Sequence, residues 1–222
     1  MVERHIVLDT ETTGLSVENG DRIIEIGAIE LINRKMTERH LHFYLNPDRM
    51  VHEDALKVHG ISNEFLADKP RFHEIVEELF AFIQGAQVII HNAEFDVGFI
   101  DYELSLLRRN VYGSINDHCA IIDTLLLARK LHPGQRNSLD ALCKRYNVKN
   151  SHRKLHGALL DAEILAQLYL TMTGGQEQLF VETKQEASTR ESINLREQIL
   201  TELKVIMASA EESLAHEAYF EA

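Results

Sequence analysis

Acidic side chains occur at three separate places in the chain where an apolar segment ends. Asp9 and Glu11 end the segment that begins at His5, and Asp96 follows the apolar residues 88–90. Asp161 marks the third place, five residues after His156. Carboxylate oxygens are ligands that suit Mg²⁺ or Mn²⁺. If the three places meet in the folded chain, they predict a site for divalent cations.

The first two acids stand two residues apart at the end of a predicted strand. Side chains at this spacing point to the same face of a sheet. The segment around Asp9 is apolar, so an uncompensated carboxylate would be costly there. A bound cation would compensate the charge of Asp9 and Glu11. A pair of solvated acids at a surface strand end is the alternative.

Asp96 and Asp161 both lie near the start of a predicted helix. For Asp96 the alternative is a charge that the helix dipole favours. His156 and Asp161 would point about 140° apart if both were helical. They converge if His156 precedes the helix and Asp161 lies one turn inside it, and Gly157 suits such a corner. With 12 histidines in the chain, a structural or surface role is the alternative for His156.

The elements that position these residues follow from the spacing of apolar side chains. Three closely spaced strands predict an antiparallel meander, and the alternation of helix and strand that follows predicts an α/β fold with a mixed sheet flanked by helices. Ser138 or Asn137 is a plausible N-cap, and Gly174-Gly175 would end the last helix of the domain. Strands are expected at 5–10, 22–32, 40–45 and 87–91, and helices at 71–84, 95–109, 138–146 and 157 to about 172. Within residues 118–130, a short strand is expected to run into a helix.

The composition changes after residue 175. Residues 176–192 are polar and charged, which predicts a flexible linker, and residues 193–208 recover helical spacing at Leu195, Ile199, Leu203 and Ile206. We therefore expect a domain over 1–175, a linker over 176–192 and a helical segment within 193–222.

Bulk properties limit the class of protein. The chain has 222 residues, 45% hydrophobic and 26% charged, which indicates a soluble globular protein. Its apolar runs are far shorter than the roughly 18 residues of a membrane span, so no membrane association is expected. We find no secretion signal at the N-terminus. Cys119 and Cys143 have no metal-type spacing, and a reducing, cytoplasmic location is expected.

The net charge of −12 argues at first against a nucleic-acid partner. The charge is uneven, however: from residue 176 onward there are four basic and ten acidic residues, whereas residues 129–154 hold eight basic residues and one acid, Asp140. This basic stretch could meet a phosphate backbone, and a solvated helix face is the alternative. Carboxylates that hold divalent cations could also contact a polyanion.

Three segments together resemble the three exonuclease motifs of the DEDDh branch of the DnaQ-like exonucleases, in their order and spacing. The resemblance covers about residues 4–175. It implies a ribonuclease H-like fold with five strands and a two-metal 3′→5′ exonuclease that removes mismatched DNA 3′ ends during replication. The segments are IVLDTETTG at 6–14, IIHNAEFDVGF at 89–99 and HGALLDA at 156–162.

The resemblance also implies a role for each site residue. Asp9, Glu11, Asp96 and Asp161 would hold two divalent cations, Mg²⁺ or Mn²⁺, with Asp9 between them and Asp96 acting mainly through the outer ligands. His156 would be the catalytic base that takes a proton from the attacking water.

The resemblance further implies contacts to the substrate. Asp9, Glu11 and Asp161 would contact the bound nucleotide, as would His59 and the acid five residues before it, Asp54. The family pattern leads us to expect a glutamate at position 54, so Asp54 is a shorter substitute. Two apolar side chains, Leu15 and Phe99, could wedge or stack on the terminal bases, with core packing favoured for Phe99.

The tail carries the predicted protein partners. Gln176-Glu177-Gln178-Leu179-Phe180 resembles the Q-x-x-L-F pattern with which bacterial proteins bind the sliding clamp. By the resemblance, residues 193–222 would dock on the alpha subunit of a replicative polymerase, and a small theta-type subunit is a further expected partner. A helix folded back on its own domain, or disorder, is the alternative for this segment.

Two rival functions stay open at this point. One is a related exonuclease that acts on RNA 3′ ends or short oligonucleotides, which the tail argues against. The other is a non-catalytic subunit that bridges polymerase and clamp. The presence of all five expected catalytic residues argues against a dead site.

Overall fold

A computed structural model of the chain describes residues 2–150 and 155–185, with side chains placed up to residue 174. The residues up to 174 form one compact unit, and a second unit begins at Gly175. The expected polymerase-binding segment 193–222 and the end of the expected linker lie outside the described residues.

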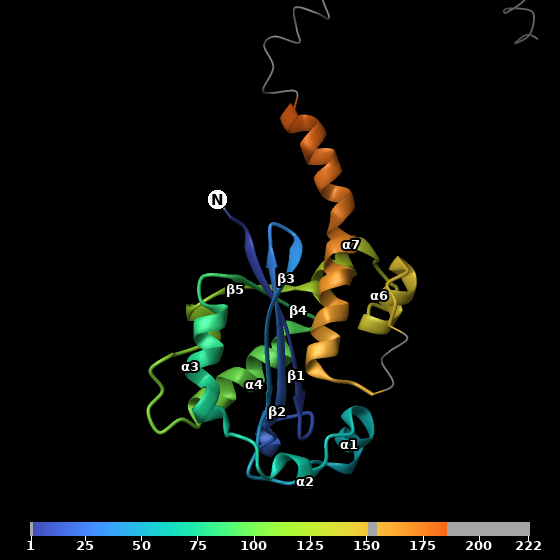
Figure 1. The fold of residues 1–222 in the computed structure, drawn as a ribbon. Coiled ribbons are helices and arrows are strands. Elements are labelled where there is room, and N and C mark those ends of the chain that lie inside the picture. Colours follow the sequence, from blue (N-terminus) through green and yellow to red (C-terminus); the bar gives the residue numbers. More distant parts are fainter. Residues whose placement is uncertain (1, 151–154, 186–222) are drawn as a thin grey trace, which may run out of the picture. The chain divides into compact units, whose positions relative to one another are not determined.

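A five-stranded mixed sheet in the order β3-β2-β1-β4-β5 forms the centre of the first unit (Figure 1). The first three strands pair antiparallel as the predicted meander, and β4 and β5 add parallel strands beside β1. The predicted α/β fold with a mixed five-stranded sheet is therefore confirmed. The strands are β1 (Arg4–Thr12), β2 (Ile23–Ile32), β3 (Lys35–Tyr44), β4 (Gln87–Ile90) and β5 (Ala120–Asp123).

Helices cover both faces of this sheet, with α3 and α4 on one face and α6 and α7 on the other (Figure 1). Ile6 and Leu8 of β1 belong to the core of the α3–α4 face, and Val7 between them belongs to the core of the α7 face. All three side chains have 0% exposure, because helices cover both faces of the strand. A strand covered in this way is apolar throughout. The helices are α1 (Glu53–His59), α2 (Asn63–Leu66), α3 (Phe72–Ile83), α4 (Ala93–Ser105), α5 (Thr124–Leu131), α6 (Leu139–Tyr146) and α7 (Ala158–Gln185), with short 3₁₀ turns at Val17–Asn19 and Ile115–Asp117.

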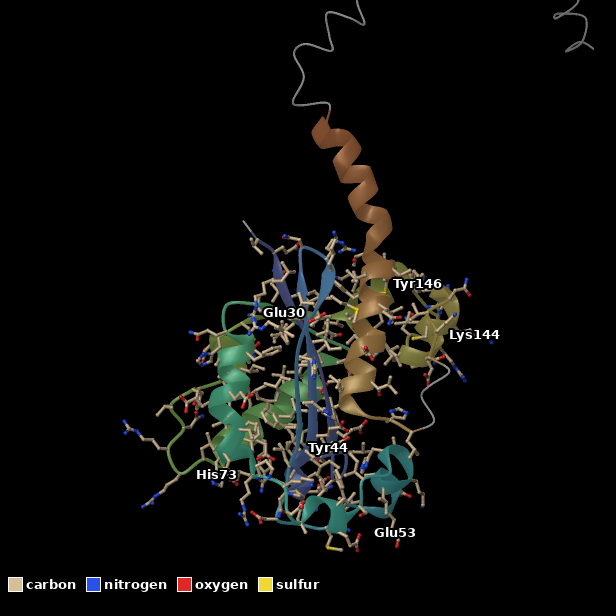
Figure 2. The ribbon with its side chains drawn as sticks, in the orientation of Figure 1. Glu30, Tyr44, Glu53, His73, Lys144 and Tyr146 are labelled. Carbon is tan, nitrogen blue, oxygen red and sulfur yellow. The ribbon has the colours of Figure 1, made fainter. Side chains whose placement is uncertain are left out.

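Side chains fill the layers between sheet and helices and project from the outer helices into solvent (Figure 2). The edge strand β3 is the exception among the strands, since most of its residues are exposed or half-buried. Glu30 on β2 is nevertheless buried, because Arg4 and Arg39 bind its carboxylate at 2.8 and 3.0 Å. The sheet thus buries apolar side chains at its centre and compensated charges toward its edge.

The predicted helix end at Gly174-Gly175 is wrong, because α7 continues to Gln185. A glycine weakens a helix by about 1 kcal/mol but keeps its N–H and can adopt helical angles. Helix-forming residues such as Gln176 and Leu179 follow, with no proline to break the hydrogen-bond ladder. The expected clamp motif, residues 176–180, is therefore helical in its backbone, as are residues 176–185 of the expected linker.

Two further differences concern residues 35–66. Strand β3 begins at Lys35, five residues before the predicted start, because its exposed first half pairs with β2 without showing an apolar pattern. Helices α1 and α2 were not predicted, since they span only 7 and 4 residues and are too short for a helical period to show.

Ser138 is the N-cap of α6 as expected, accepting a hydrogen bond from the N–H of Ala141. None of the helices in the described part of the chain combines the length and apolar character needed to cross a bilayer.

Candidate active site

A small pocket of about 180 Å³ brings together all five residues predicted for metal binding and proton transfer. We call it the carboxylate pocket. It lies where β1 ends, at the starts of α4 and α7. Its lining residues are Asp9, Thr10, Glu11, His91, Asn92, Phe95, Asp96, Leu139, His156 and Asp161.

The alternation of β1 and a close helix approach place three of the carboxylates. Asp9 and Glu11 alternate with Thr10 and so share the α7 face with Val7. Asp9 pairs across the sheet with Gly27 of β2. A side chain at Gly27 would overlap the backbone of Ala158 and Leu159. The missing side chain therefore lets the start of α7 rest on the sheet beside Asp9 and brings Asp161 to the pocket.

We expect Gly27→Ala to lower both activity and stability. The new methyl group must push α7 off the sheet, and overpacking of this kind costs about 1–3 kcal/mol. A displacement of about 1 Å at Asp161 lowers the rate by roughly 100-fold. Thermal unfolding and single-turnover hydrolysis measure the two effects.

The matched control for this substitution is Gly98→Ala. Its added methyl group meets nothing within 4 Å on α4, and alanine favours a helix over glycine by about 0.5–1 kcal/mol. It should raise stability slightly and keep full activity. Equal behaviour of the two variants would refute the close-approach role of Gly27.

His156 and Asp161 converge in the way predicted for a loop-to-helix corner. The helix begins at Ala158, and the N–H of Asp161 donates to the carbonyl of Gly157 at 2.8 Å. His156 lies before the helix, where its backbone N–H donates to the carbonyl of Val58. Its Nδ1 is 3.4 Å from Asp161 Oδ2, and its side chain is 42% exposed. The imidazole is thus held beside a buried carboxylate while it stays accessible to water.

Asp96 reaches the pocket from α4 and is 4% exposed. The hydroxyl of Thr10 donates to Asp96 Oδ1 at 2.7 Å. Burial raises the pKa of Asp96 to about 7; the Thr10 hydrogen bond opposes this shift, and the nearby Asp123 carboxylate adds to it. A carboxyl group with this pKa is only partly charged near neutrality, and a bound cation would favour its charged form.

The donor set of the pocket fits divalent cations. Ligand atoms of Glu11, His156 and Asp161 all lie within 4.8 Å of one another. Asp9 and Asp96 line the same pocket. Oxygen donors of this number and charge suit Mg²⁺ or Mn²⁺. Four carboxylates gathered around such a small volume would repel one another without a cation.

A second pocket of about 440 Å³ adjoins the carboxylate pocket and shares Thr10, Glu11 and Phe95 with it. We call it the His59 pocket. His59 is 5% exposed, and its Nδ1 accepts a hydrogen bond from the N–H of Ile61. Burial lowers the pKa of His59, although the backbone of Thr12 opposes the shift. Because Nδ1 accepts this hydrogen bond, a neutral His59 ring carries its proton on Nε2, which is buried.

The other residues predicted to contact the substrate differ in the exposure of their side chains. Asp54 lines the His59 pocket, but its side chain is 96% exposed and pairs with Lys57 at 2.8 Å. Leu15 lines the same pocket and is 86% exposed. Phe99 is 2% exposed within the core. The structure therefore leaves Leu15 as the candidate wedge and assigns Phe99 to core packing.

Sequence reasoning missed two residues of the site. Phe95 lines both pockets, and Thr10 holds Asp96. Each adjoins a predicted acid, but a strand or helix sends neighbouring side chains in different directions. Alternation placed Thr10 on the opposite face from Asp9, and only the packing of α4 against that face brings Asp96 to it.

Comparisons with known proteins point to one family. The family model described as "Exonuclease" matches residues 6–169. The DNA polymerase III subunit epsilon of Salmonella typhimurium is 50% identical, over 98% of this chain and 92% of that protein. That of Pasteurella multocida is 51% identical, over 97% and 87%.

Solved structures with the same fold are also exonucleases. Exonuclease X in complex with 5′ overhanging duplex DNA has a TM-score of 0.60 and 27% identity, covering 77% of this chain and 92% of that one. Escherichia coli Exonuclease I in complex with a dT13 oligonucleotide has a TM-score of 0.67 at 19% identity, over 81% of this chain and 43% of that one. This second likeness supports the fold alone.

Proposed function

The chain belongs to the exonuclease family, and on this premise we propose that it is the proofreading 3′→5′ exonuclease subunit of DNA polymerase III, which removes mismatched 3′-terminal deoxynucleotides. Its similarity to epsilon subunits extends over nearly the whole chain. The observation that carries the proposal is the convergence of four carboxylates and one histidine from distant parts of the chain in one pocket. A subunit that only bridges partners has no need of such a pocket.

The family depends on divalent metals, and we assign the ligands from the pocket. Asp9, Glu11, Asp96 and Asp161 would hold two cations, Mg²⁺ or Mn²⁺. The cations supply charge neutralisation at the phosphoryl oxygens and activation of water. Thr10 holds the buried Asp96 carboxylate in place. The donors therefore need little reorganisation before reaction.

His156 would act as the general base. Its half-exposed ring can accept a proton from the attacking water and release it to solvent. Asp161 at 3.4 Å would stabilise the imidazolium that forms. His59 would contact the terminal nucleotide from the wall of its pocket. Asp54, at the rim of that pocket, would make a weaker contact because water surrounds it.

Selection of mismatched ends would not require reading of the bases. A mismatched terminus unpairs more readily, and an unpaired end reaches the pocket more often. Leu15, exposed at the His59 pocket, would lie against the terminal base. We expect little sequence preference from this arrangement.

The decisive experiment is the digestion of matched and mismatched primer ends with Mg²⁺, Mn²⁺ or EDTA. We expect nucleotides to be released from the 3′ end, faster from mismatched ends, with EDTA abolishing the reaction. Digestion of matched RNA and DNA primers tests the alternative substrate. Faster cleavage of RNA ends would favour an exoribonuclease, and activity in EDTA would refute the metal mechanism.

Association with DNA polymerase III follows from the proposed family role, and we propose three specific contacts. Residues 193–222 would bind the alpha subunit, residues 176–180 the sliding clamp, and the exonuclease domain a small theta-type subunit. The cytoplasmic location stays a prediction.

Deleting residues 176–222 should keep exonuclease activity, because every residue of the carboxylate pocket precedes residue 175. The deletion should abolish binding to the polymerase, because it removes the proposed binding segment. A shorter deletion of residues 186–222, which keeps α7 intact, is the matched control for damage to this helix. Co-purification of the chain lacking 176–222 with the polymerase would contradict the assignment of the tail.

A further inference from the structure

The carboxylate pocket lies between two other hollows, and they differ in charge. On one side it shares Thr10, Glu11 and Phe95 with the His59 pocket. On the other it shares His91, Asn92 and Leu139 with a groove of about 780 Å³. We call this the Arg129 groove. Its other lining residues are Leu125, Arg129, Gly134, Gln135, Asn137 and Ser138.

Hydrogen bonds fix the walls of the Arg129 groove. Asp123 accepts from the backbone N–H groups of Asn92 and Ala93 at the start of α4 and of Leu125 and Leu126 at the start of α5. The two helix starts are therefore held at a constant separation. Arg129 projects into the groove one turn beyond Leu125 on the same face of α5.

The third wall, formed by residues 132–138, is held by Arg145. Its guanidinium donates to Asn137 Oδ1 at 3.1 Å and to the carbonyl of Arg136 at 2.9 Å. Asn137 in turn donates to the carbonyl of His132. Arg145 and Asn137 are engaged in these bonds, and Arg129, Asn92 and Gln135 line the groove beside them.

The charges of the three hollows differ in a way that suits a strand with one free end. Glu11, Asp21 and Asp54 line the His59 pocket. Arg49 and Lys57 pair with the last two, but no lysine or arginine is among the described residues that line this pocket. No acid is among the described residues that line the Arg129 groove, whereas Arg129 is, and it is exposed. Lys130, Arg136 and Lys144 are exposed on the neighbouring helices and loop, and Figure 2 shows Lys144 extending outward from α6.

We propose that the Arg129 groove binds the phosphodiester backbone of the substrate strand on the 5′ side of the bond that is cut. The terminal nucleoside, which ends in a hydroxyl, occupies the His59 pocket, and the scissile phosphate lies at the carboxylates. This inference rests on the proposed exonuclease function. It assigns the strand polarity and gives the basic stretch around residues 129–145 a role in an otherwise acidic protein.

The test compares a substrate that has an upstream strand with one that has none. Thymidine 5′-monophosphate p-nitrophenyl ester fills the positions of the terminal nucleotide and the scissile phosphate but has no further phosphate. A single-stranded 12-nucleotide DNA fills the same positions and also has upstream phosphates. Arg129→Gln should lower kcat/KM for the DNA about tenfold at low salt, through loss of one charge-assisted contact. It should also reduce the slope of log(kcat/KM) against log[salt] by about 0.7 per lost phosphate contact. Hydrolysis of the nitrophenyl ester should stay within about twofold of wild type. Arg129→Glu should enlarge both effects on the DNA.

Lys35→Gln is the matched control. It removes the same charge from an exposed lysine that pairs with Ile32, at the opposite end of the sheet from Asp9 and Glu11. The inference is overturned if Arg129→Gln and Lys35→Gln give the same DNA kinetics and salt slope. It is also overturned if Arg129→Gln slows the nitrophenyl ester as much as the DNA. If the wild type hydrolyses neither substrate, the proposed function itself fails, which is a distinguishable result.

Discussion

Asp96→Asn should abolish hydrolysis and at the same time make the metal-free protein more stable. Asp96 is buried at 4% exposure and accepts a hydrogen bond from Thr10 on Oδ1. Asparagine keeps that acceptor and the volume but carries no charge. We expect the rate to fall by at least about 1,000-fold, since a charged ligand that stabilises the transition state is lost.

The gain in stability follows from the raised pKa of Asp96, about 7 against 3.8 for an ordinary aspartate. Below about pH 3.8 the carboxyl is protonated in both the folded and the unfolded chain, and its full stabilisation is present. Between about pH 3.8 and about pH 7 the carboxyl ionises in the unfolded chain but stays largely protonated in the folded chain, so stability falls over this range and levels off above it. The substitution removes this loss, and at pH 8 without metal it should raise the free energy of unfolding by about 2–4 kcal/mol.

Thermal unfolding with and without Mg²⁺ measures the effect. The wild type should gain stability from Mg²⁺, because the cation binds only the folded state, and Asp96→Asn should gain much less. Asp68→Asn removes an exposed carboxylate and is the control, with activity and unfolding close to wild type. An Asp96→Asn protein that is less stable than wild type at pH 8 would refute the buried-charge argument, and full activity would refute the ligand assignment.

His156→Ala should lower kcat by about 100- to 10,000-fold, the contribution of a general base, while metal binding persists. The side chain is 42% exposed, so its removal leaves no core cavity. The increase of kcat with pH that a general base produces should disappear in the variant. His40→Ala, which changes an exposed histidine on the edge strand β3, should leave both the rate and its pH profile unchanged.

Metal binding decides between the two roles that the geometry allows for His156. Ligand atoms of Glu11, His156 and Asp161 lie within 4.8 Å of one another, so this histidine could also be a ligand. Titration of the variant with Mn²⁺ separates the two roles. An affinity near that of wild type supports the general base, and loss of binding would place His156 in the ligand set instead.

Much of the fold was predictable because its signals are local. Buried strands such as β1 show as apolar segments, and α3 shows its helical period. The end of α7 and the helices α1 and α2 were not predictable in this way. A glycine pair does not by itself stop a helix, and a helix of 4 or 7 residues is stabilised by packing rather than by its own period.

The residue types of the site and the faces of their elements could be predicted from the sequence, since side-chain alternation in β1 depends only on backbone geometry. How those faces meet depends on the folding of the whole domain. The contact of α7 with Gly27, the hydrogen bond from Thr10 to Asp96 and the Asp123 bridge between α4 and α5 join segments far apart in the chain. Such contacts depend on packing in three dimensions, and no local pattern of residues encodes them.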